Sequence, residues 1–205
     1  QFINYNDEFS KELEQDLKKN KIKLYDEDES SWHFKSSTRQ VCNVVFETKS
    51  FKKIKDNKLR DQEKEKAYQI MRDKGNFDYQ RNLKEFSPKS YEIIKNSNKF
   101  LKDGQPTGKI LFYSNYKEDG GSGVFQEVLK AQGYEKFDIR KHNINDLIST
   151  QNKKKRYTLV TGDLDKRINE QRENIDAFNN TENKYGEYIQ FILISSAGAE
   201  GISLS

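Results

Sequence analysis

Residues 190–204 read QFILISSAGAEGISL, and this stretch decides the fold. Its first part, up to Ile194, is an almost unbroken apolar run, which is typical of a strand buried on both faces of a parallel sheet. Small residues follow from Ser195 to Gly201. They leave backbone N–H groups uncovered, as a bound phosphate requires. The stretch therefore predicts a strand that ends in a phosphate-facing turn.

The same pattern occurs twice earlier in the chain. Residues 109–114 read KILFYS and residues 157–162 read YTLVTG, and each run predicts a buried strand followed by a turn. Amphipathic helical patterns alternate with these strands, so parallel βαβ units and an open, doubly wound α/β sheet are expected. Helices are expected at 87–103, 124–133 and 164–180. Ser87 is expected to cap the first of them, which should end near Asp103-Gly104. A short extra strand is expected at 134–139.

The first part of the chain is more charged and more weakly patterned. Residues 7–19 suit a helix, and residues 39–46, RQVCNVVF, suit an extended buried segment. Residues 50–85 carry mixed charges with few apolar anchors and predict exposed helix and loop. We therefore expect a charged, mostly helical arm or insertion at 1–86, followed by the α/β domain at 87–205.

Composition narrows the function. The chain has 205 residues, a net charge of +4, one cysteine and two histidines. The charge permits a nucleic-acid partner. The few Cys and His residues argue against a disulfide framework or a zinc site. No apolar run reaches the ~18 residues of a membrane span, and an intracellular setting without a membrane partner is expected.

A complete nucleotide hydrolase is not expected. A P-loop follows a strand with Gly-x-x-x-x-Gly-Lys-Ser/Thr, and no such run is present. Residues 104–109, GQPTGK, come before a strand, and Ile110 replaces the hydroxyl residue. This chain alone is therefore predicted to be inactive as an enzyme.

Several segments together resemble the C-terminal RecA-like domain of superfamily 2 helicases and translocases, in the Swi/Snf-like branch. They are RQVCNVVF (39–46), SPK (87–89), KILFYSNY (109–116), GGSGVF (120–125) and the closing SSAGAEGISL (195–204). The details are most similar to helicases and nucleoside triphosphatases of large DNA viruses of the poxvirus, asfarvirus and mimivirus types. The resemblance implies a RecA-like doubly wound parallel sheet with a largely helical N-terminal arm or insertion, truncated before motif VI.

The resemblance also implies roles for particular residues. Strand-end turns would face the nucleic-acid backbone, and the last segment would approach the nucleotide across a cleft between two motor domains. Ser203 stands where the family usually has Asp or Asn. The implied nucleic-acid-binding residues are Ser114, Asn115, Thr161, Gly162, Arg172, Ser195 and Ser196, and the implied nucleotide-binding residues are Glu200, Gly201 and Ser203.

By the same resemblance, the chain would be half of an ATP-dependent nucleic-acid helicase or translocase of viral transcription. ATP and Mg2+ would be bound mainly by a missing N-terminal RecA-like domain. The other implied partners are nucleic acid, with DNA favoured over RNA, and RNA polymerase or transcription factors. The implied setting is the virion or the host cytoplasm.

Two other functions are compatible with the residues. One is a non-catalytic module that binds nucleic acid or a polymerase surface, and the other is a nucleotide-sugar enzyme that uses the Gly120–Gly123 loop. That loop suits a flexible connector as well as a ligand site. The basic run at 153–156, KKKR, is more typical of a solvated loop than of a binding site.

Overall fold

The computed structural model describes residues 43–46, 56–116, 120–139, 141–160, 168–195 and 204. All of them belong to the second of the two units into which the chain divides, Thr38–Ser205. Among these described residues, no helix is long and apolar enough to cross a membrane.

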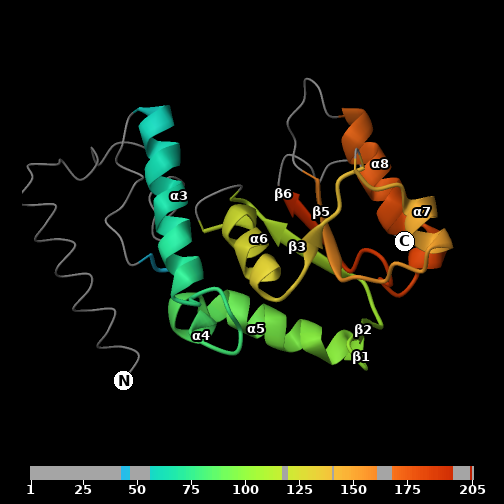
Figure 1. Ribbon diagram of the computed structural model, residues 1–205, viewed down its shortest axis with the longest axis horizontal. Helices are drawn as coiled ribbons and strands as arrows, with labels where there is room; N and C mark the ends of the chain where they lie inside the picture. The colour runs from blue at the N-terminus through green and yellow to red at the C-terminus, as the bar shows by residue number, and fades with distance from the viewer. Residues whose placement is uncertain are drawn as a thin grey trace, which may run out of the picture. The chain divides into compact units, whose positions relative to one another are not determined.

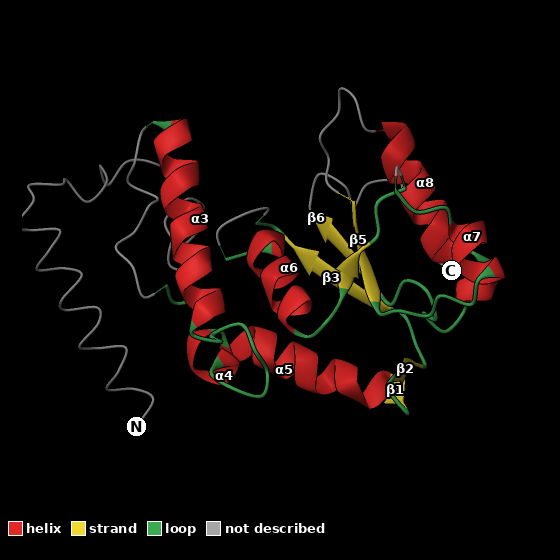
Figure 2. Ribbon diagram, viewed as in Figure 1, coloured by secondary structure: helices red, strands yellow, loops and turns green. Residues whose placement is uncertain are grey.

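A four-stranded parallel sheet forms the centre of this unit (Figures 1 and 2). Its strands lie side by side in the order β3-β6-β5-β4, so β6 is central although it comes last in the sequence. Every residue of β6 is buried, as its apolar sequence predicts. The strands are β3 (Ile110–Ser114), β4 (Glu135–Lys136), β5 (Arg156–Val160) and β6 (Phe191–Ser195).

Helices cover both faces of the sheet. The connection from β3 to β4 crosses the whole sheet through α6 (Ser122–Ala131), and later connections return through α7 (Ile144–Ser149) and α8 (Ile168–Asn179). Right-handed crossovers that run in opposite directions place their helices on opposite faces. The doubly wound α/β class predicted from the sequence is thereby confirmed, and the arrangement is consistent with a RecA-like fold.

Each face of the sheet packs against its own apolar core, and successive side chains of β6 point alternately into the two cores. Phe191 and Leu193 join α6 in the first core, and Ile192 and Ile194 join α7 and α8 in the second. This alternation is the ordinary two-residue period of a strand. The same alternation determines which face of the sheet the last side chains of β3 and β6 lie on, and these side chains are candidate site residues.

The helix expected at 87–103 is shorter than predicted. α5 (Pro88–Ser97) is followed by a 3-10 turn and then by a small hairpin of β1 (Leu101–Lys102) and β2 (Gln105–Pro106). Asp103 and Gly104 form the hairpin turn with φ of 52° and 75°. Positive φ at both turn residues is typical of a type I′ turn, for which Asp-Gly is a favoured pair. The expected helix end at Asp103-Gly104 was therefore wrong.

The described part of residues 50–85 is less exposed than predicted. α3 (Asn57–Asp73) buries Ala67, Tyr68 and Met71 on one face, and α4 (Leu83–Phe86) buries Leu83. Tyr68, Met71 and Leu83 share the first core with α6 and β6. The prediction missed this face because three buried positions are spread over an otherwise charged helix. The division at residue 86/87 stays a prediction.

Candidate nucleic-acid interface at the carboxyl ends of β3 and β6

Ser114 and Ser195 are register partners at the carboxyl ends of the parallel strands β3 and β6. Ligands of open α/β sheets bind at this edge. Both side chains continue the alternation that places Phe112, Phe191 and Leu193 on the α6 side of the sheet. The structure therefore brings together two of the predicted nucleic-acid-binding residues, although 80 residues of sequence separate them.

The hydroxyl of Ser195 is buried and has no hydrogen-bond partner in the described part of the chain. Ser195 is only 1% exposed. Leaving a buried hydroxyl unpaired costs about 1–3 kcal/mol, so such groups are uncommon in folded proteins. At a ligand-binding edge, such a hydroxyl is a candidate contact.

The hydroxyl of Ser114 is engaged within its own turn. It donates to the Tyr116 carbonyl and accepts from the Tyr116 N–H, both at 3.1 Å. The next residue, Asn115, is exposed, and its Oδ1 accepts from the Tyr113 hydroxyl at 2.7 Å. These bonds hold the chain that leaves β3 in one shape.

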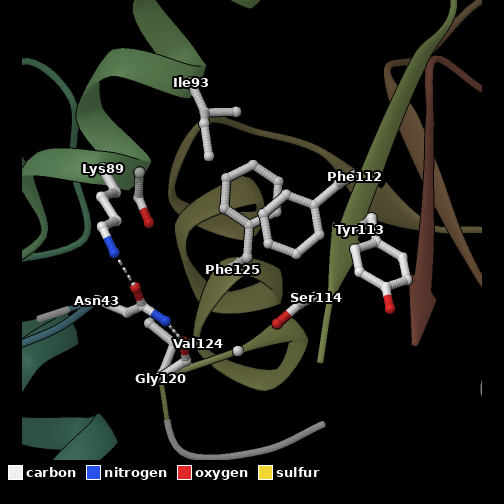
Figure 3. Close-up of a pocket in the computed structure, with 11 residues that line it drawn as sticks. Asn43, Lys89, Ile93, Phe112, Tyr113, Ser114, Gly120, Val124 and Phe125 are labelled. Carbon is white, nitrogen blue, oxygen red and sulfur yellow. Dashed lines mark hydrogen bonds between the residues drawn. The ribbon is translucent and has the colours of Figure 1, made fainter. Parts of the chain in front are cut away.

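A cavity of about 170 Å³ lies beside this turn (Figure 3). It is bordered by the first residues of α5, by β3 and by the loop that leads into α6. Phe112 and Phe125 stack along one wall, with ring centroids 4.1 Å apart. The polar part of the lining is Asn43, Lys89, Ser90, Ser114, Gly120 and Gly121, and the apolar part includes Ile93 and Val124.

Asn43 connects three segments at the mouth of this cavity, as Figure 3 shows in part. Its Nδ2 donates to the Gly120 carbonyl at 2.6 Å, and its Oδ1 accepts from the Lys89 ammonium at 2.8 Å. Its backbone carbonyl accepts from the Ser87 hydroxyl at 2.6 Å. Ser87 is therefore the N-cap residue of α5, as predicted, but its hydroxyl bonds to Asn43 and makes no side-chain capping bond to the helix.

The glycine loop is shaped by close packing. Gly120 has a φ of 85°, which favours glycine. A Cβ on Gly121 would lie 1.8 Å from the Tyr116 carbonyl oxygen, so no side chain fits there. The described end of this loop is therefore closely packed against the end of β3, and the choice between connector and ligand loop stays open.

The remaining predicted site residues lie elsewhere. Arg172 is exposed on α8, on the sheet face opposite the cavity. The others lie outside the residues that the structure describes, so their roles stay predictions. They are Thr161, Gly162, Ser196, Glu200, Gly201 and Ser203.

The basic run at 153–156 supports the amino end of the sheet. Arg156 is 1% exposed, and its guanidinium donates to the carbonyl and the side chain of Asn152, both at 2.9 Å. Lys155 donates to the Gln132 carbonyl at 3.0 Å, and Lys154 pairs with Glu135 at 2.9 Å. Burial lowers the pKa of both Arg156 and Lys155. Three of these four residues thus have structural partners.

Sequence reasoning did not select Asn43 or Lys89 as site residues. Both lie in segments that carried the family resemblance, residues 39–46 and 87–89, and this was the available signal. In the described residues, no group of His, Cys, Asp or Glu could hold a metal ion.

The chain is similar to a protein of Acanthamoeba polyphaga mimivirus named "Putative ATP-dependent RNA helicase R563". The two are 26% identical over 188 residues, which is 92% of this chain but only 27% of the mimivirus protein. No family model and no solved structure matches the chain. The similarity supports a viral, helicase-like relationship.

Proposed function

We propose that this chain is the C-terminal motor-domain part of an ATP-dependent nucleic-acid helicase or translocase. The main support for this proposal is the similarity of the chain, along 92% of its length, to the mimivirus protein that is named as an ATP-dependent RNA helicase. The sheet geometry agrees with it, because Ser114 and Ser195 lie together at the ligand-binding edge. The Swi/Snf-like branch of superfamily 2 and a role in viral transcription belong to the same proposal.

In this function the carboxyl edge of the sheet holds one nucleic-acid strand by its phosphates. The unpaired hydroxyl of Ser195 donates to a phosphate oxygen, and its register partner Ser114 holds the neighbouring turn in shape through its bonds to Tyr116. Contacts of this kind do not read bases, so binding is independent of sequence. Asn115, Thr161, Gly162 and Ser196 extend this edge in the proposal, and Arg172, which lies on α8 at the opposite face of the sheet, adds a separate contact.

ATP binds between this domain and another that carries the P-loop, because the chain itself has none. Glu200, Gly201 and Ser203 approach the nucleotide from this side, and Mg2+ accompanies the ATP phosphates in the other domain. Closure of the two domains on ATP then moves the strand held at the sheet edge. The proposed setting is a virion or an infected cell's cytoplasm, with transcription proteins as partners.

The test compares this chain with the full product of its gene. ATP hydrolysis is measured for both, without nucleic acid and with duplex DNA, single-stranded DNA or RNA. We expect no hydrolysis by the chain alone and stimulated hydrolysis by the full product, with DNA more effective than RNA. Stronger stimulation by RNA would reverse the choice of nucleic acid. No stimulation by any of them contradicts the motor and leaves a non-catalytic binding module.

A further inference from the structure

We propose that the cavity between the starts of α5 and α6 binds one backbone phosphate of the nucleic-acid strand. Lys89 is its cation, and Asn43 is the residue that positions Lys89. This inference rests on the proposed function, because it assigns a further contact to the same sheet edge. It concerns residues that neither the sequence patterns nor the similarity to the mimivirus protein assigns.

The charge of the cavity favours an anion. Lys89 is the charged member of the described lining, which contains no carboxylate. Its partner is the neutral amide of Asn43, at 2.8 Å. Some other lysines of the described surface pair with carboxylates, as Lys66 does with Glu63 and Lys95 with Glu92, whereas Lys99 also donates to a neutral amide, that of Asn96. An ammonium has three N–H groups, so Lys89 has two besides the one it gives to Asn43.

Two helix starts add to this charge. No side chain caps α6, because its cap residue is Gly121, and none caps α5, because the Ser87 hydroxyl is directed to Asn43. The first N–H groups of a helix carry partial positive charge and suit a phosphate. At these two starts the Ser122 N–H already donates to the Tyr116 carbonyl and Pro88 has no N–H, so the following N–H groups are the ones concerned. Both helices have ten residues, and both border the cavity next to Lys89.

The cavity also adjoins the proposed path of the strand. Ser114 lines it, and the register partner of Ser114 is Ser195, which carries the unpaired buried hydroxyl. A strand that contacts Ser195 thus passes the mouth of the cavity. The stacked Phe112 and Phe125 supply an apolar wall for the sugar carbons next to the bound phosphate.

The arrangement predicts how Asn43 acts. Its side chain bonds to Lys89 on one side and to the Gly120 carbonyl on the other, so it holds the ammonium against the glycine loop. It touches the phosphate only through Lys89, which makes it a positioning residue. Replacing its amide by a carboxylate neutralises the cavity without changing the shape of the side chain.

The test measures the binding of a short fluorescein-labelled oligothymidine to the 205-residue chain over a series of salt concentrations. Removing one phosphate contact lowers the slope of log affinity against log salt by about 0.7 for single strands. We expect this loss for Lys89→Met and for Asn43→Asp, and a preserved slope for Lys89→Arg. Lys95→Met, on the same helix and away from the cavity, is the matched control and keeps the wild-type slope.

Circular dichroism melting of each variant separates loss of contact from loss of fold, and Lys89 is exposed enough to be replaced without unfolding. A wild-type slope for Lys89→Met, or an equal loss for Lys95→Met, overturns the assignment. The proposed function has its own readout in the hydrolysis assay. If nucleic acid stimulates hydrolysis by the full product but Lys89→Met keeps the wild-type salt slope, only the phosphate contact of the cavity is contradicted. If Lys89→Met lowers the salt slope but no hydrolysis is stimulated, only the motor function is contradicted.

Discussion

The guanidinium of Arg72 on α3 donates to the carboxylate of Glu127 on α6 at 2.7 Å, and this pair ties the charged N-terminal segment to the sheet domain. Glu127 is buried and also accepts from Lys130, while Arg72 also pairs with Glu65. Removing Arg72 leaves the buried Glu127 carboxylate with one of its two cationic partners, the more exposed Lys130. We expect Arg72→Met to lower the free energy of unfolding by about 1–3 kcal/mol, measured by urea denaturation.

The same pair predicts a pH dependence. Burial alone would raise the pKa of Glu127, but hydrogen bonds from Lys130 and Arg72 outweigh burial and lower this pKa in the folded chain. A lowered carboxyl pKa contributes stability above the pKa of the unfolded chain, about 4.3, and this contribution is lost as the pH falls through the folded value. Glu127→Gln should therefore flatten the fall in melting temperature between neutral pH and the acid range; an unchanged profile would contradict the pairing.

Ser195→Ala should separate binding from stability. The Ser195 hydroxyl has no partner in the described residues, so its removal sacrifices no hydrogen bond and should leave the melting temperature unchanged or slightly higher. Oligonucleotide affinity should fall. Ser114→Ala is the comparison, since it removes the two bonds to Tyr116 and should lower stability by about 1 kcal/mol. A clear loss of stability in Ser195→Ala would indicate a structural hydroxyl.

Gly121→Ala should disturb the cavity wall. Its new Cβ would lie 1.8 Å from the Tyr116 carbonyl, so the loop must move and oligonucleotide binding should weaken. Gly133→Ala is the matched control at the other end of α6. Nothing lies within 4 Å of a Cβ there, although its φ of 81° costs about 1–2 kcal/mol. Gly133→Ala should lower stability without changing oligonucleotide affinity. Equal affinities of Gly121→Ala and Gly133→Ala would contradict a role of the Gly121 wall in binding.

Asn183 predicts a large effect on stability alone. It is fully buried, and its side chain donates to the Phe178 and Ile189 carbonyls and accepts from the N–H groups of Tyr188 and Ile189. These four bonds hold the approach to β6. Asn183→Ala should lower the free energy of unfolding by about 2–4 kcal/mol. A urea midpoint close to the wild-type value would show that water replaces the amide.

The strands were predictable from sequence where their burial was complete. β5 and β6 appear as continuous apolar runs because they lie inside the sheet and both of their faces are covered. β3 was recognised as a strand from its apolar run, but its predicted burial on both faces was wrong, because it is an edge strand on which Leu111 and Tyr113 are exposed. α7 has only six residues and was missed, because so short a segment carries little periodicity. Asp103-Gly104 was misassigned because glycine marks a helix end and a hairpin turn equally well.

The candidate site was predictable only in part. Ser114 and Ser195 followed from their positions at strand ends, since parallel strands share a carboxyl edge. The bond between Asn43 and Lys89 joins segments 46 residues apart, and local patterning contains no signal for such a contact. Ser87 shows the same limit of sequence-based prediction. Its position before a helix can be recognised from the sequence, but the direction of its hydroxyl, toward Asn43, cannot.

The central position of β6 also determines when the sheet can form during synthesis. Of the four strands of the parallel sheet, β6 is the last to leave the ribosome, yet β3 and β5 have it as their shared neighbour. Until it emerges, β3 has no strand to pair with, and pairing across so long a separation is slow. Nascent chains that stop before Phe191 should therefore remain protease-sensitive, and protection should appear in one step when β6 becomes available.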